Sequence, residues 1–163
     1  MAEQITLDTN LLVEYWKEQE RRETVQKLLD LSETGAIELA VTSRIRQDVP
    51  APPLSEMINH LPEIGVTESG SVTRLGYWQL GVDQLGDDAF AAFSAKVAEL
   101  AASSGQREPD WRDWDHLHAH YLQGRDVFLT WDSGILHIAD QLRDEFGIVV
   151  TTPEHYLRSH QSE

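Results

Sequence analysis

Short apolar segments alternate with longer amphipathic stretches along most of this chain. Four apolar segments have the length and composition of buried strands, and they cover residues 5–7, 37–41, 127–130 and 148–150. The stretches between them carry apolar side chains at helical spacing, most clearly over residues 87–102. Strands that alternate with helices favour parallel pairing through right-handed crossovers. The pattern therefore predicts an α/β domain built on a parallel sheet.

Residues 64–86 do not follow this alternation, because glycines divide them into short pieces. A loop excursion, a hairpin and a partner-binding surface are all compatible with such a composition. One more short helix is expected just before, over residues 54–61. A chain of 163 residues is long enough to bury one core. We predict a single domain over residues 1–163, with an atypical segment over about residues 54–105.

The stretch DWRDWDHLHAHYLQGRDVFLTWDSGIL, residues 110–136, has the clearest local pattern. It predicts a helix, a tight turn at Gly124 and a short apolar strand that ends close to Asp132. The core-facing stripe of the helix is expected at Trp114, Leu117 and Tyr121. Asp115 lies beside this stripe. Charge is costly next to a buried face and at the mouth of a buried strand, so both carboxylates indicate a function.

A further carboxylate follows a strand near the start of the chain. The first predicted strand leads directly into Asp8, as the third leads to Asp132. In an open parallel sheet the ligand crevice lies outside the carboxyl ends of the strands, where the strand order reverses. If these two strands are neighbours there, Asp8 and Asp132 face each other. Asp115 is then placed to lean over the crevice, and Asp48 lies about one turn into the helix after the second strand. Converging carboxylates need a hard divalent cation, and Mg²⁺ or Mn²⁺ suits them.

The amino-acid composition limits which partners this protein is expected to bind and in which cellular compartment it is expected to lie. The formal charge is −15, from 28 acidic residues against 13 Lys and Arg, which is unlike a protein that holds nucleic acid mainly by neutralising phosphates. No apolar run approaches the roughly 18 residues that a membrane helix needs. The start MAEQITLDTN lacks the features of a signal peptide, and without cysteine there are no disulfides or thiolate metal sites. We expect a cytoplasmic protein with no membrane partner.

The ordered acidic positions are similar to those of the PIN-domain nucleases. The resemblance rests on Asp8-Thr9-Asn10 after the first strand, on Asp115 with its helix and Gly124, on FLTWD ending in Asp132, and on FGIVVTTPEHYL near the end. It covers both ends of the chain and little of the middle. It implies a three-layer α/β/α fold with a central parallel sheet. It also implies an endoribonuclease that hydrolyses RNA phosphodiester bonds with a water activated by Mg²⁺ or Mn²⁺.

Roles for individual residues follow from this match and from their positions. Four acids are expected to be catalytic and to hold the metal ion: Asp8, Asp48, Asp115 and Asp132. Asp48 stands where the family usually has Glu. Asn10 and Thr130 are expected to orient the carboxylates or bound water, as groups behind a metal site do. Arg46 and His118 are candidate contacts for the RNA. Because many family members are toxins held by a small antitoxin, an antitoxin or other protein partner is expected, and so is a homodimer.

Other functions stay open at this point. The chain is alternatively a catalytically weak or inactive PIN-like module that binds RNA or a protein partner, which the acidic composition favours. A phosphatase of haloacid-dehalogenase type also begins with an Asp at a strand end, but it needs a second Asp where Asn10 stands. His116 and His120 have a helical spacing compatible with zinc, although neither the Glu of a metalloprotease motif nor a Cys accompanies them. Asp132 has a structural alternative as the cap of a short helix.

Overall fold

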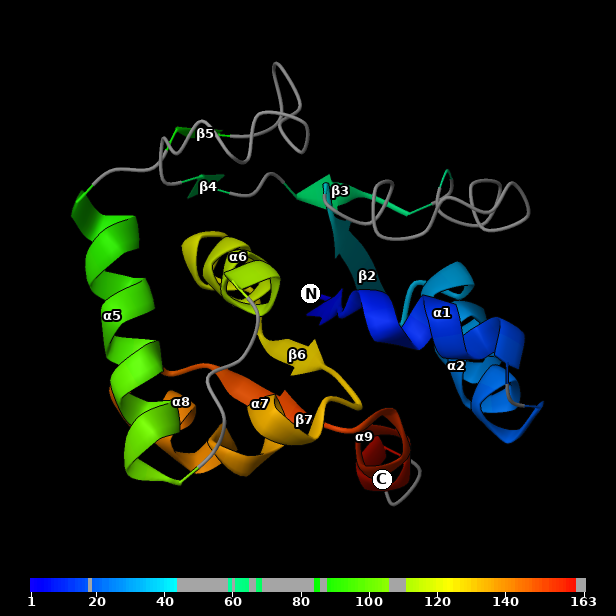
Figure 1. Ribbon diagram of the computed structural model, residues 1–163. Coiled ribbons are helices and arrows are strands. Elements are labelled where there is room, and N and C mark those ends of the chain that lie inside the picture. Colours follow the sequence, from blue (N-terminus) through cyan, green and yellow to red (C-terminus); the bar gives the residue numbers. More distant parts are fainter. Residues whose placement is uncertain are drawn as a thin grey trace.

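The computed structural model describes residues 1–17, 19–43, 59, 61–64, 67–68, 84–85, 88–105 and 111–160. Its centre is a five-stranded parallel sheet in the order β3-β2-β1-β6-β7 (Figure 1). The strands are β1 (Glu3–Leu7), β2 (Ile37–Thr42), β3 (Glu63–Ile64), β6 (Val127–Leu129) and β7 (Val149–Thr151). The predicted parallel sheet is confirmed, and β3 is an additional strand that the hydrophobic pattern does not predict.

Helices cover both faces of this sheet and complete three layers (Figure 1). One face carries α1 (Thr9–Lys17), α2 (Gln19–Glu33) and α9 (Pro153–His160). The other face carries α5 (Asp88–Ser103), α6 (Trp111–Leu122), α7 (Ser133–His137) and α8 (Ala139–Phe146). The fold is therefore the expected three-layer α/β/α arrangement. Within the described part of the chain, every helix is too short or too polar to cross a membrane.

The pleat of the strands divides the interior into two apolar cores. Leu7 of β1 and Leu129 of β6 are fully buried on the side of α1, α2 and α9, where Leu157 packs with them. Phe128 points to the opposite face and packs in a second core with Leu117 of α6. Successive side chains of a strand point to opposite faces. A strand covered on both faces is therefore apolar at nearly every position, as the short central segments of this sequence are.

The strand order reverses between β1 and β6. From β1 the chain adds β2 and β3 on one side, and it later returns to the other side of β1 to add β6 and β7. Leu7, the last residue of β1, is in register with Leu129, the last residue of β6. The carboxyl ends of these two strands therefore meet at the switch point, where open α/β sheets bind their ligands.

Helix α6 is more deeply buried than an amphipathic pattern suggests. Every side chain from Trp114 to His120 is buried. Tyr121, however, is 44% exposed, so its expected place in the core-facing stripe is wrong. Its ring instead stacks on Phe93 of α5, with 5.6 Å between the ring centroids. The last turn of α6 thus divides its side chains: His120 is buried against β1, whereas Tyr121 lies over α5 and α8.

Two short strands are described within the glycine-rich segment. β4 (Thr67–Glu68) and β5 (Gln84–Leu85) pair in parallel and form a second, two-stranded sheet. Parallel strands need a crossover connection, so these two are not the arms of a hairpin. The helix expected over residues 54–61 lies outside the described residues, apart from residues 59 and 61.

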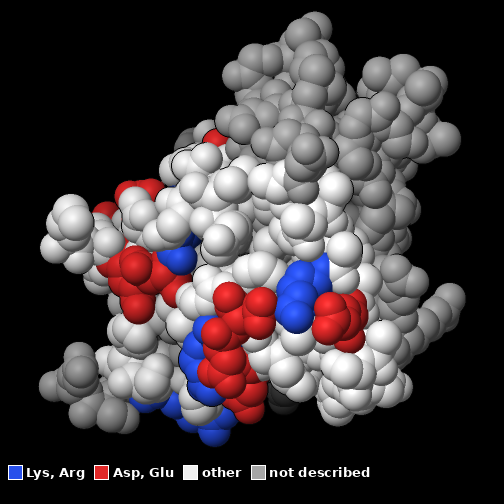
Figure 2. Space-filling model, turned by 90° about the vertical axis from the view of Figure 1, so that its left-hand side faces the viewer, with Lys and Arg blue, Asp and Glu red and all other residues white. Residues whose placement is uncertain are grey.

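The surface at the α5 side of the molecule carries mixed charge. Lys96 and Glu99 of α5 form an ion pair at 3.5 Å, and Arg143 of α8 pairs with Asp140 at 3.3 Å and with Asp144 at 3.4 Å. Figure 2 shows acidic and basic side chains next to each other on this face. Exposed ion pairs of this kind contribute little to stability.

Candidate active site

Asp8 occupies the first position after β1, at the switch point of the sheet. Its backbone N–H donates to the carbonyl of Leu129 at 2.9 Å, which extends the pairing of β1 with β6 by one residue. Its carbonyl accepts from Leu11 N at 3.1 Å, so α1 begins directly after it. The residue is only 4% exposed. The strand and the helix together hold the Asp8 side chain at the carboxyl edge of the sheet.

Thr130 links Asp8 to Asp132 through its hydroxyl group. Thr130 Oγ1 donates to Asp8 Oδ2 at 2.6 Å, and it accepts from the backbone N of Asp132 at 2.9 Å. Asn10 Nδ2 also donates to this hydroxyl, at 3.2 Å, while Asn10 Oδ1 accepts from Trp131 N at 3.4 Å. Asn10 and Thr130 thus hold the ends of β1 and β6 in one hydrogen-bonded unit around the Asp8 carboxylate.

Asp132 caps the short helix α7. Its φ and ψ of −67° and 117° are extended, and its Oδ1 accepts from Ile135 N at 2.9 Å. A Cβ at Gly134 would lie 3.1 Å from this same Oδ1, which favours glycine there. Asp132 therefore does act as a helix cap, which is the structural alternative that the sequence offers for it. This does not exclude a role in a site, because capping engages one oxygen of the carboxylate.

Burial raises the pKa of the Asp8 carboxyl group above its usual value of 3.8. Nearby His116 and the hydrogen bond from Thr130 oppose this shift, whereas the negative charge of Asp132 adds to it; the N–H of Thr9 also lowers the pKa. Asp132 therefore lies close enough for the two carboxylates to repel each other. Like charges held together in a buried place are unfavourable unless a cation accompanies them.

Helix α6 brings His116, which directly follows Asp115, to the same edge of the sheet. Asp115 is fully buried, and His116 is 2% exposed. His116 Nε2 lies 3.3 Å from Thr9 Oγ1, and its Nδ1 forms a short hydrogen bond with Thr42 Oγ1. The ring therefore lies between the end of β2 and the start of α1. The sequence suggests His116 only as a zinc ligand. Its position directly after Asp115 is the signal that indicates a place beside the carboxylates.

The other two histidines of α6 point elsewhere. The His118 ring lies between Phe90 and Phe93 of α5, with 4.9 Å to each ring centroid, so it packs in the core; a contact with RNA stays a prediction. His120 Nδ1 is 2.8 Å from Thr6 Oγ1 on β1. His116 and His120 thus contact different parts of the sheet, and this separation does not support the zinc alternative.

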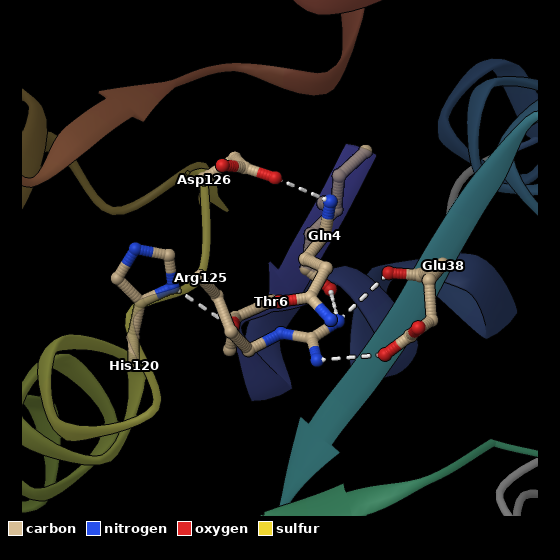
Figure 3. Close-up of polar contacts among 7 residues, drawn as sticks. Gln4, Thr6, Glu38, His120, Arg125 and Asp126 are labelled. Atoms are coloured by element: carbon tan, nitrogen blue, oxygen red, sulfur yellow. Dashed lines mark hydrogen bonds and ion pairs between the residues drawn. The ribbon is translucent and has the colours of Figure 1, made fainter. Parts of the chain in front are cut away.

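His120 contacts Thr6 within β1 and lies beside a polar cluster that extends from there to the amino ends of the strands (Figure 3). Arg125 donates to Glu38 Oε1 and to the carbonyl of Ile5, both at 3.0 Å, and to the carbonyl of Glu38 at 2.7 Å. Gln4 N donates to Asp126 Oδ2 at 2.7 Å. These bonds join β1, β2 and β6 where the strands begin, so the cluster stabilises the sheet at the edge opposite the candidate site.

The fold was compared with solved structures over the length of the chain. The chain is similar to one in a structure of FitAB bound to an IR36 DNA fragment, with a TM-score of 0.49, 18% sequence identity, and coverage of 91% of this chain and 94% of that chain. At this TM-score and identity the likeness supports no further conclusion. No family model and no curated protein matches the sequence. The three-layer architecture agrees with a PIN-like fold, whereas membership of that family stays a prediction.

The chemistry of Asp8 and Asp132 fits a divalent metal ion. Both offer hard oxygen ligands, and a cation between them removes their mutual repulsion. Among the residues that the structure describes, no group of three or more acidic, histidine or cysteine side chains is arranged to hold a metal ion. Asp48 and Arg46 lie outside those residues. The roles of Asp115 and Asp48 as ligands therefore stay predictions.

Proposed function

We propose that this chain is a metal-dependent endoribonuclease that hydrolyses phosphodiester bonds in RNA. The observation that supports it is the position of Asp8 and Asp132, two carboxylates that follow adjacent strands at the switch point of a parallel sheet. Burial and mutual repulsion raise the pKa of Asp8, an arrangement that costs stability. A carboxyl group whose pKa is shifted in such a location, as that of Asp8 is, is typical of a functional site.

In this proposal Asp8 and Asp132 hold Mg²⁺ or Mn²⁺, and Asp115 and Asp48 complete the ligands. The ion, when bound, supplies a Lewis acid that activates water and neutralises charge on the phosphate. Thr130 fixes the Asp8 carboxylate through its 2.6 Å hydrogen bond. The cap bond from Ile135 N fixes one oxygen of Asp132. The chain therefore presents oriented oxygens and need not rearrange them when the ion and RNA bind.

The test is cleavage of a circular RNA, because only an internal cut makes a circle linear. The wild-type protein is incubated with Mg²⁺ or Mn²⁺ beside Asp8→Asn, with an EDTA-treated sample as the metal-free reference. Asp126→Asn is the matched control, because Asp126 precedes β6 at the opposite end of the strand from Asp132. We expect metal-dependent cutting by the wild type and Asp126→Asn, and none by Asp8→Asn.

Two outcomes contradict the proposal in different ways. Cutting by Asp8→Asn at the wild-type rate means that another site or a contaminant cleaves the RNA. No cutting by any variant favours the alternative, an inactive PIN-like module that binds RNA or a protein. A gel-shift titration with the same RNA then shows whether the inactive module binds RNA or a protein partner.

We also propose that the protein forms a homodimer and binds a small antitoxin protein, because the resemblance to PIN-domain nucleases implies both. Light scattering during size-exclusion chromatography distinguishes a monomer of 18.5 kDa from a dimer. A monomer at all concentrations contradicts the dimer but leaves the cleavage chemistry unaffected, because Asp8 and Asp132 belong to one chain.

A further inference from the structure

His116 connects three elements that surround the candidate site. The residue lies on α6 directly after Asp115, and its ring reaches Thr42, the last residue of β2, and Thr9, the first residue of α1. Thr9 N in turn donates a hydrogen bond to the Asp8 carboxylate. A single ring thus joins the helix that carries Asp115 to the turn that carries Asp8.

We propose that His116 is a positioning residue that holds Asp8 and Asp115 in the arrangement needed to bind the metal ion. This inference rests on the proposed function, because it concerns the ligands of that site. His116 acts through Thr9 on the Asp8 side and through its own backbone on the Asp115 side. Groups that orient metal ligands in this way commonly change metal affinity by about 10- to 100-fold when they are removed.

Comparison with the neighbouring histidines shows why packing alone does not account for this ring. His118 is equally buried, and its ring lies against Phe90 and Phe93 of α5. His116 instead places both ring nitrogens against threonine hydroxyls. Burying a polar ring costs free energy unless its nitrogens find partners. The two hydroxyl partners lie at the carboxyl ends of β2 and β1, beside the carboxylates and not elsewhere in the core.

The experiment measures Mn²⁺ binding directly, by electron paramagnetic resonance of the free ion, so that it does not depend on RNA cleavage. His116→Leu removes both hydrogen bonds, whereas His116→Gln restores a donor and an acceptor near the position of Nε2. We expect His116→Leu to weaken Mn²⁺ binding about 10-fold or more, and His116→Gln to restore most of it. His120→Gln is the matched control on the same helix, because its ring contacts Thr6 within β1, whereas the threonines that His116 contacts lie at the strand ends. Its Mn²⁺ affinity should equal that of the wild type.

A second readout follows the ring itself. Mg²⁺ is added to protein labelled with ¹⁵N at histidine, and the ring resonances are followed by NMR. We expect the His116 signals to shift on binding while those of His118 and His120 stay in place, and we expect no His116 shift in Asp8→Asn.

The failures of the two proposals are distinguishable. If the wild type binds neither ion, the proposed metal site is overturned and the role of His116 with it. If the wild type binds Mn²⁺, Asp8→Asn does not, and His116→Leu binds as tightly as the wild type, only the positioning role is overturned. If His116→Leu and His116→Gln weaken binding equally, the hydrogen bonds to the threonines are not what matters, and the inference is again wrong.

Discussion

Thr130 Oγ1 donates a 2.6 Å hydrogen bond to Oδ2 of Asp8, a residue 122 positions earlier in the chain. The same hydroxyl accepts from Asp132 N, so one side-chain oxygen organises both strand ends. Thr130→Val keeps the shape of the side chain but removes this oxygen. We expect Mn²⁺ affinity to fall about 10-fold or more, as it does when an orienting group behind a metal ligand is lost. Calorimetric titration of the metal measures this change.

Thr130→Ser is the control for that experiment, because serine keeps the hydroxyl and loses only a methyl group. It should bind Mn²⁺ nearly as the wild type does. If valine and serine at this position bind the metal equally well, the hydrogen bond to Asp8 does not orient a ligand.

Replacement of Asp8 by Asn should stabilise the metal-free protein. Burial raises the pKa of Asp8 in the folded state, so the folded protein loses stability as the pH rises from 3.8 to that higher value. An amide keeps the acceptor for Thr130 and carries no charge. We expect Asp8→Asn to raise the free energy of unfolding at pH 7 by about 1 to 2 kcal/mol, in the range of other substitutions that relieve functional strain. Urea denaturation in EDTA measures the difference.

Divalent ions should reverse this order of stability. A ligand that binds only the folded state raises its stability by mass action. Saturating Mg²⁺ should therefore raise the melting temperature of the wild type and leave that of Asp8→Asn unchanged. Equal increases for both proteins would mean that the ion binds elsewhere.

Acid should weaken the fold through His120. Burial lowers the pKa of His120 from 6.5 to about 4, and nearby Arg125 adds to the shift while Asp126 opposes it. Between these two pH values the unfolded chain binds a proton at this residue and the folded protein does not. The free energy of unfolding therefore falls as the pH falls through that window, and His120 has no effect above it. The full loss from this residue is about 3 kcal/mol by the linkage relation.

Measurement of this effect needs a variant, because many carboxyl groups also titrate below pH 6.5. His120→Gln keeps a partner for Thr6 and cannot take up a proton. The difference in unfolding free energy between wild type and variant, measured in urea from pH 4.5 to 7.5, should change across the window and be constant above it. A constant difference over the whole range would show that His120 does not titrate differently in the two states.

The sheet and the meeting of Asp8 with Asp132 could be predicted from the sequence because they depend on local patterns. Short apolar segments separated by helical periodicity favour parallel strands, and parallel strands place all their carboxyl ends at one edge. Two acids that closely follow such strands then meet if the strands are neighbours, as β1 and β6 are. The pairing of β1 with β6 is the one long-range contact on which this prediction depends, and the structure supplies it.

The remaining features depend on contacts that a single sequence does not contain. β3 has two residues, too few for a periodic pattern. Tyr121 continues the helical stripe in the sequence, but its ring packs on Phe93 of α5 and Phe146 of α8, which are contacts between elements that no local pattern contains. His116 is placed by Thr9 and Thr42, which are distant in the sequence and become neighbours only through the strand order. The ligand roles of Asp48 and Asp115 stay predictions.

Arg125 should stabilise the sheet far more than an exposed arginine with similar partners. Its side chain is 5% exposed and donates to the Glu38 carboxylate and to two backbone carbonyls (Figure 3). Arg125→Met leaves these carbonyls without their charged donor, and we expect a loss of about 2 to 4 kcal/mol. Arg143→Met is the control: Arg143 also pairs with carboxylates, but its side chain is 56% exposed, and its loss should cost at most about 1 kcal/mol. Urea denaturation of both variants decides the matter, since equal losses would mean that the buried cluster joins the three strands no more strongly than a surface ion pair.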